Sequence, residues 1–261
     1  RQKLALITFT EKVRQAYKRM IEEGYEEDYA KVIASYLGLV VDRMADYGSN
    51  LCIWHTQWES IPNTFARQAL PMVWDYGELN LLSPILAGTW NSMLGQILKT
   101  LFHLSQIPNS PLTTVCQASA TDLPYPDDYF DAVFIDPPYY DNVPYSYLSD
   151  FFYVWLKRTV GELYSELFMT LLTPKSKEIV AYSYQEGGFE AGKRYFESML
   201  KRAFKEIARV LKPNGIATIV YAHKSTSGWE TLINSLLESE LVPTASWTVN
   251  TESKVRINAQ G

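Results

Sequence analysis

The sequence predicts an α/β fold, with a helical first half and a doubly wound, mainly parallel sheet in the second half. In three stretches of the first half, apolar side chains recur at the spacing of amphipathic helices. From residue 114 onward, short apolar runs alternate with amphipathic segments, which is typical of strand–helix–strand units whose strands run parallel. We therefore expect a helical insertion or subdomain at 1–110 and a sheet domain at 111–261.

Amphipathic helices are expected in the first half where apolar residues form a stripe. These stripes cover 4–21, 32–44 and 90–102, and Gly24 is suited to end the first helix. Stripes of this kind are typical of helices that pack together around a core, and we expect these helices to do so.

Strands and helices are expected to alternate in the second half. The expected strands are 114–118, 131–136, 216–222 and 241–249, and the expected helices are 146–157, 191–211 and 226–239. The apolar run Ala132–Ile135 is typical of a buried strand. Pro213, Asn214 and Gly215 are expected to form the turn before the strand at 216–222.

Composition excludes several classes of protein. The chain has 261 residues, of which 47% are hydrophobic and 20% charged, so it is not disordered. Its formal net charge of −5 gives no basic footprint of an autonomous DNA-binding domain. No apolar run reaches the roughly 18 residues that cross a bilayer, so no membrane span is expected. Two isolated cysteines favour a reducing cytoplasm, and the three histidines lack metal-ligand spacing, so no metal site is expected.

The tetrapeptide Asp136-Pro137-Pro138-Tyr139 directly follows the expected strand 131–136. Ligands of parallel α/β sheets bind at the carboxyl ends of strands, so this position favours chemistry. Asp136 offers a carboxylate that accepts hydrogen bonds. The two prolines stiffen the loop and leave their carbonyl oxygens free as acceptors. Tyr139 offers a ring on which a flat base can stack.

This tetrapeptide resembles the D-P-P-Y motif of amino-methyltransferases that use S-adenosyl-L-methionine and act on exocyclic nitrogens. The longer stretch DPPYYDNVPYSYLSDFFYVWLKR, residues 136–158, is similar to the adenine-specific DNA methylases that also carry a zinc ribbon. The segments ARQALPMVWDYGE, LLTPKSKEIVA, AHKSTSGWETLI and TASWTVNTE look like the same family. The resemblance therefore spans nearly the whole chain.

The resemblance implies a sheet of the S-adenosyl-L-methionine-dependent methyltransferase type that methylates N6 of a flipped adenine in DNA. Residues 136–139 would be catalytic: Asp136 and the carbonyl of Pro137 accept hydrogen bonds from the amine, and the tyrosine stacks on the base. Ser119, Ala120 and Asp136 would contact the cofactor, with Ser119 at the place where the family carries an acidic residue.

Further polar and aromatic residues lie near the tetrapeptide or at the matching end of another strand. Tyr140, Asn142 and Tyr145 either line the base pocket together with the motif tyrosine or pack within the loop. His223 and Lys224 follow the strand expected at 216–222, where they either contact substrate or form a polar surface pair.

The glycine-rich loop that holds the methionine end of the cofactor has no counterpart here, because no G-x-G occurs among the 13 glycines. In the resembled family this loop and the zinc ribbon lie upstream. We therefore expect an upstream part of the same polypeptide as a partner. Two alternatives remain open: the same chemistry on RNA or a protein amide, and a catalytically silent interaction subunit.

Overall fold

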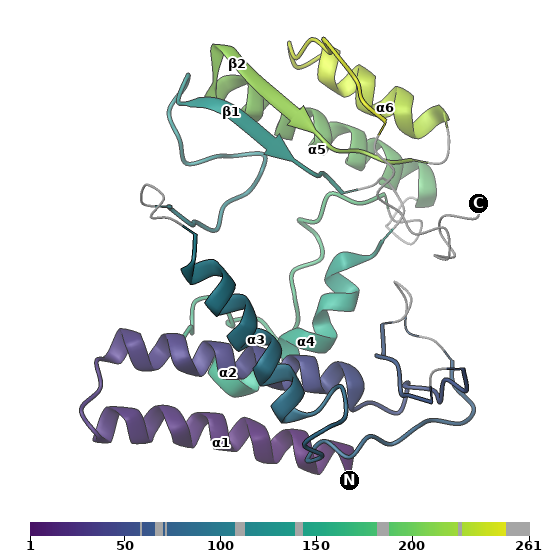
Figure 1. The fold of residues 1–261 in the computed structure, drawn as a ribbon. Helices are drawn as coiled ribbons and strands as arrows, with labels where there is room; N and C mark the ends of the chain where they lie inside the picture. Colours follow the sequence, from purple (N-terminus) through teal and green to yellow (C-terminus); the bar gives the residue numbers. More distant parts are fainter. Residues whose placement is uncertain are drawn as a thin grey trace. The chain divides into compact units, whose positions relative to one another are not determined.

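A computed structural model describes residues 1–57, 59–65, 70, 72–107, 113–138, 143–181, 188–223 and 226–248 (Figure 1). Within these residues the protein is a mixed helix-and-strand structure whose sheet has two parallel strands. The chain forms two compact units. The first, which we call the helical unit, comprises Arg1–Thr113 and Tyr145–Ser176, and the second, the sheet unit, comprises Thr114–Pro144 and Lys177–Gly261.

The helical unit confirms the three helices expected from the apolar stripes of the first half and also contains the helix expected at 146–157 in the second half. Its helices are α1 (Gln2–Glu22), α2 (Glu27–Tyr47), α3 (Trp90–Ser105) and α4 (Tyr145–Val160). Gly24 ends α1 as expected, with a φ of 83°. Its N–H donates to the carbonyl of Ile21, and the N–H of Tyr25 donates to that of Met20, each at 3.0 Å. This is a Schellman cap, in which glycine adopts the left-handed conformation without a steric penalty.

The core of the helical unit is formed mainly by α1, α2 and α3. Val40 and Met44 of α2 are fully buried beside Leu6 of α1 and Met93 of α3. Gly38 lets α4 approach α2 closely, because a Cβ atom at this position would lie 3.2 Å from Val160 Cγ1. These four helices are therefore held by apolar packing, as the stripes predict.

The sheet unit contains α5 (Gly188–Val210), α6 (Thr226–Leu237) and the parallel strands β1 (Phe130–Ile135) and β2 (Leu211–Ile219). The pairing runs from Phe130 opposite Leu211 to Ile135 opposite Ile219. The expected turn at 213–215 is absorbed into β2 as an irregularity, because Ala132 pairs with Ile216. As a result β2 begins directly after α5, earlier than the sequence predicts.

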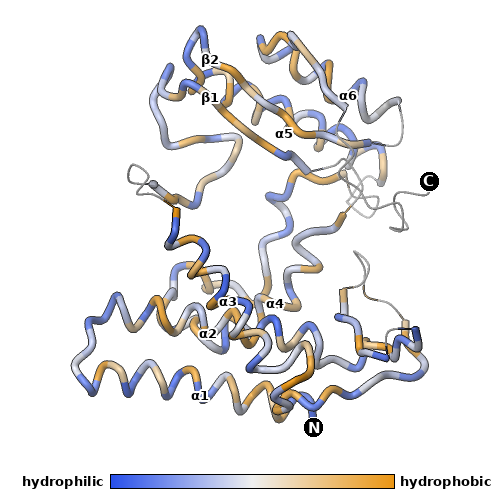
Figure 2. The backbone as a smooth tube through the Cα atoms, in the orientation of Figure 1, coloured by the Kyte–Doolittle hydropathy of each residue, from blue (hydrophilic) through white to orange (hydrophobic). Residues whose placement is uncertain are grey.

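Helices α5 and α6 cover one face of the two-stranded sheet. Phe196, Phe204 and Leu232 of these helices are buried against alternate strand residues. Those strand residues are Val133, Ile135, Ala217 and Ile219. The intervening side chains point to the other face, where Phe134 is 72% exposed and Ile216 is 69% exposed. Because apolar side chains lie on both faces, the two strands are hydrophobic along much of their length (Figure 2).

Two expected strands are wrong in the described part of the chain. Residues 114–118 form no strand, and neither do residues 241–248. A strand requires a partner for its backbone groups, and apolar character alone does not supply one. Val115, for example, is 91% exposed. No described helix is long and apolar enough to span a bilayer.

Candidate functional site

The carboxyl ends of β1 and β2 lie at the same edge of the sheet because the strands are parallel. At this edge the N–H of Val220 donates to the carbonyl of Ile135 at 2.9 Å, which continues the pairing one step beyond the strands. Asp136 follows Ile135 directly. The structure thus places Asp136 beside the segment that leaves β2, as the sequence predicts for residues that follow parallel strands.

The side chain of Asp136 is exposed, whereas the Pro137 that follows is buried. Exposure alternates along this stretch, so Asp136 continues the open face that carries Phe134. Within the described residues, the carboxylate of Asp136 makes no hydrogen bond or ion pair. It is therefore available to accept hydrogen bonds from a ligand at the sheet edge.

Aromatic side chains from the segment after β2 and from α6 pack against one another. The rings of Tyr221 and His223 lie parallel with centroids 6.3 Å apart, and Trp229 meets Tyr221 edge-on at 5.4 Å. The indole of Trp229 donates to the carbonyl of His223 at 3.1 Å. Gly228 gives the imidazole room, because a Cβ atom there would lie 2.2 Å from His223 Nδ1. The structure therefore fixes His223 against the segment that leaves β2 and the first turn of α6.

Most of this aromatic cluster was missed by sequence reasoning, which selected only His223. Tyr221 and Trp229 are separated along the chain by the beginning of α6, so apolar spacing does not pair them. The closest sequence signal is Gly228 within a helix, since an interior glycine often marks a close approach.

Ser119 and Ala120 lie in an exposed turn that the hydroxyl of Ser119 stabilises. The N–H of Asp122 donates to the carbonyl of Ser119 at 3.1 Å, and the N–H of Thr121 donates to its hydroxyl oxygen at 3.3 Å. Among the described residues, no hydrogen bond or ion pair joins this turn directly to Asp136. The structure thus brings Asp136 and the carboxyl end of β2 together. It shows no direct bond between them and the Ser119–Ala120 turn among the described residues.

Two of the three residues assigned to the cofactor, Ala120 and Asp136, present polar groups without a partner among the described residues, whereas the hydroxyl of Ser119 is bonded within its own turn. Within the described part of the chain, the N–H of Ala120 has no acceptor, and the carboxylate of Asp136 has no donor. An exposed N–H can donate to a ring nitrogen of an adenine, and a carboxylate can accept from a hydroxyl or an amine. These are group types that the adenosine end of S-adenosyl-L-methionine can bond, and their assignment to it stays a prediction. No G-x-G loop for its methionine end occurs in this chain.

Several predicted substrate contacts lie outside the described residues, namely Tyr139, Tyr140, Asn142 and Lys224. Tyr145 is described as the first residue of α4, in the helical unit. Its side chain is 41% exposed, and its carbonyl accepts a hydrogen bond from the hydroxyl of Ser149 at 2.7 Å. Its role as a base contact stays a prediction.

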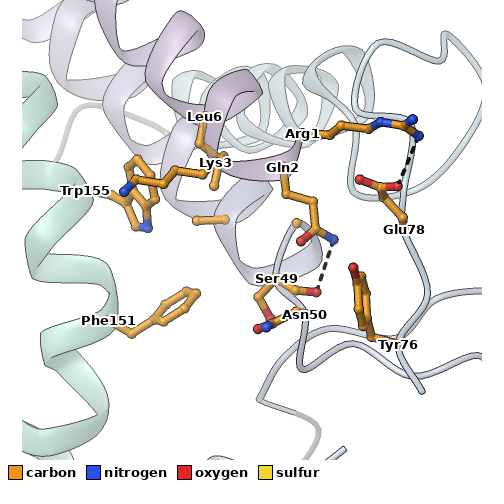
Figure 3. A pocket seen from close by; sticks show the side chains of 12 residues that line it. Arg1, Gln2, Lys3, Leu6, Ser49, Asn50, Tyr76, Glu78, Phe151 and Trp155 are labelled. Carbon is orange, nitrogen blue, oxygen red and sulfur yellow. Dashed lines mark hydrogen bonds and ion pairs between the residues drawn. The ribbon is translucent and has the colours of Figure 1, made fainter. Parts of the chain in front are cut away.

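A cavity of about 420 Å³ lies within the helical unit, and none of the predicted site residues lines it (Figure 3). Its wall combines the aromatic side chains of Phe151 and Trp155 with polar groups from the start of α1. Two of those polar groups already have partners. The amide of Gln2 donates to the carbonyl of Ser49 at 3.3 Å, and Arg1 lies 3.8 Å from Glu78.

Comparison with known proteins gives no relative for this chain: no family model, no curated protein and no solved structure matches it.

Proposed function

We propose that this chain is the catalytic part of a methyltransferase that acts on N6 of adenine in DNA, with S-adenosyl-L-methionine as the methyl donor. The observation that carries the proposal is the exposed, unbonded carboxylate of Asp136 at the carboxyl edge of a parallel strand pair, directly before a diproline. The resemblance of residues 136–158 to adenine-specific DNA methylases supplies the reaction class.

The proposed chemistry uses acceptors that the tetrapeptide provides. The carboxylate of Asp136 and the carbonyl oxygen of Pro137 accept hydrogen bonds from the two protons of the adenine amine. A hydrogen bond to a charged acceptor contributes about 1.5–3 kcal/mol. Held in this way, the nitrogen lone pair leaves conjugation with the ring and points toward an electrophile. S-adenosyl-L-methionine would supply the activated methyl group. As the carbon–nitrogen bond formed, the bond between the methyl carbon and the sulfonium sulfur would break, S-adenosyl-L-homocysteine would leave, and the amine proton would pass to Asp136 or to water.

The proposed architecture is a doubly wound, mainly parallel sheet of the methyltransferase type. The parallel pairing of β1 with β2 and the covering of one face by α5 and α6 support it. The exposed apolar side chains of the other face also support it, because parallel sheets are normally covered on both faces. We further propose that an upstream part of the same polypeptide contributes to this sheet and supplies the glycine-rich cofactor loop, and that the enzyme works in the cytoplasm.

The proposal is tested by methyl transfer from labelled S-adenosyl-L-methionine to adenine-containing DNA with the full-length protein. Asp136→Ala is expected to lower the rate of methyl transfer at least about a hundredfold, because it removes the acceptor that orients the amine. Asp131→Asn is the matched control, since Asp131 is an exposed acid at the opposite end of β1. Transfer that survives Asp136→Ala would contradict the mechanism.

The same assay separates the alternatives. Transfer to RNA or to a protein amide, and not to DNA, would keep the chemistry and change the substrate class. The lack of a G-x-G loop favours a catalytically silent interaction subunit as the second candidate. A wild-type protein that transfers no methyl group to any of these substrates, although it is folded, would support that candidate.

A further inference from the structure

Glu206 and Arg209 form a two-pronged ion pair at the end of α5. Arg209 donates through Nε to Glu206 Oε1 at 3.0 Å and through Nη2 to Oε2 at 2.8 Å. The two residues are three positions apart on one helix, so both side chains project from the same side. The planar guanidinium thus faces the planar carboxylate, and two parallel hydrogen bonds make this ion pair stronger than one with a single hydrogen bond.

This ion pair, which we call the clamp, also binds the backbone of the segment at 123–127. Glu206 Oε2 accepts from the N–H of Leu123 at 2.8 Å. Arg209 donates to the carbonyl of Leu123 at 3.1 Å, to the carbonyl of Tyr125 at 2.8 Å and to the carboxylate of Asp127 at 2.8 Å. The clamp therefore fixes this segment through donors and acceptors together.

Both members of the clamp stay charged at physiological pH. The hydrogen bonds from Arg209 and from the backbone of Leu123 lower the pKa of Glu206 to about 2. The hydrogen bonds to Glu206 and Asp127 raise the pKa of Arg209 above its usual value. The two charges of the clamp therefore persist on both sides of neutral pH.

The turn that carries Ser119 and Ala120 ends at Asp122, immediately before the clamped Leu123. The hydrogen bonds of that turn are internal, and Ser119, Ala120 and Asp122 are all exposed. Its position relative to α5 is therefore set by the residues that follow it. The clamp holds the first of those residues on both its N–H and its carbonyl.

We propose that Glu206 and Arg209 are positioning residues for the cofactor: they set the location of the Ser119–Ala120 turn and thereby the affinity for the adenine of S-adenosyl-L-methionine. This inference rests on the proposed function. Neither residue acts on the reacting atoms. Loss of the clamp is expected to weaken cofactor binding and to leave the chemical step unchanged once the cofactor is bound.

Arg209→Gln in the full-length protein provides the test. The Kd for S-adenosyl-L-methionine is measured by calorimetry without DNA and is expected to rise with the KM, and KM and kcat are measured at saturating DNA. The expected result is a KM raised about tenfold and a kcat within about twofold of wild type, because several hydrogen bonds to a charged group are lost. Arg209→Lys keeps the positive charge but loses the planar guanidinium and its paired hydrogen bonds. It is therefore expected to give a KM between those of the wild type and Arg209→Gln.

Lys212→Gln is the matched control. Lys212 forms an exposed ion pair with Asp131 at 2.6 Å near the start of β2 and does not contact 123–127. It is expected to leave KM unchanged. An unchanged KM in Arg209→Gln, or a loss confined to kcat, would overturn the inference. If Arg209→Gln does not fold, Arg209→Lys and Glu206→Gln decide by the same KM criterion. A wild-type protein that neither binds the cofactor nor transfers methyl groups would overturn the proposed function instead.

Discussion

Asp42 lies in the middle of α2 and is only 6% exposed. Its Oδ1 atom finds no hydrogen-bond partner among the described residues. Burial in an apolar environment disfavours the charged form and raises the pKa of this carboxyl to about 8. The folded protein therefore keeps a neutral carboxylic acid inside the helical unit at a pH where an unfolded chain would be ionised.

Stability is expected to fall with rising pH because of this one group. Above the unfolded pKa of about 4, the unfolded state releases a proton that the folded state retains. The stabilisation is fully present below that pH and is lost as pH rises toward 8, at about 1.4 kcal/mol per pH unit. Urea unfolding at a series of pH values should show that, between the unfolded and the folded pKa, the free energy of unfolding of Asp42→Asn falls less steeply with pH than that of the wild type.

Asp28→Asn is the control for this measurement, because Asp28 is an exposed acid on the same helix. It should reproduce the wild-type slope. A slope that Asp42→Asn leaves unchanged would show that Asp42 is solvated or paired in solution.

Gly215 permits the irregular register between β1 and β2. A Cβ atom at this position would lie 2.7 Å from Leu211 Cδ1 and 3.0 Å from the carbonyl oxygen of Asp131. The second contact is with backbone, which cannot rotate away, so the strands would have to separate. We expect Gly215→Ala to lower the free energy of unfolding of the sheet unit by about 1–3 kcal/mol.

Chemical denaturation of Gly215→Ala beside Gly95→Ala checks this prediction. Gly95 lies on α3, and a Cβ atom there meets no atom within 4 Å. Its replacement is expected to be neutral or stabilising by about 0.5–1 kcal/mol. Equal stabilities for the two variants would mean that the register adapts without cost.

Helices could be predicted from the sequence more fully than strands, for a physical reason. A helix satisfies its backbone groups internally, so the apolar stripe and a cap such as Gly24 are enough to locate α1. A strand depends on a partner, so the short stretch 114–118, with Val115 and Cys116, did not suffice. The position of Asp136 could be predicted because strand direction alone determines which end carries ligands.

The rest of the candidate site depends on tertiary contacts that no local pattern encodes. Arg209 reaches Tyr125 across 84 positions of the chain, and Tyr221, which follows β2, meets Trp229 of α6. Composition shows only that such residues exist. Their partners depend on the way α5 and α6 pack on the strands.

For the molecule as a whole, the open face of the sheet is the feature with the largest consequence. Phe134 and Ile216 lie on it beside the edge that carries Asp136, and both are largely exposed. Two parallel strands with one covered face bury little apolar surface, and parallel sheets are normally covered on both faces. If the upstream part that we propose above belongs to this sheet, it is expected to pack on this face.

Phe134→Gln tests that expectation when it is made both in the chain of residues 1–261 and in the full-length protein. Burial of a phenylalanine contributes about 1.5–3 kcal/mol relative to exposure, so the full-length protein should lose roughly that much stability. The shorter chain should lose almost nothing, because Phe134 is already exposed there. Phe102→Gln, on α3 and 69% exposed, should be neutral in both proteins. Equal small losses for Phe134→Gln in the two proteins would mean that the upstream part binds elsewhere.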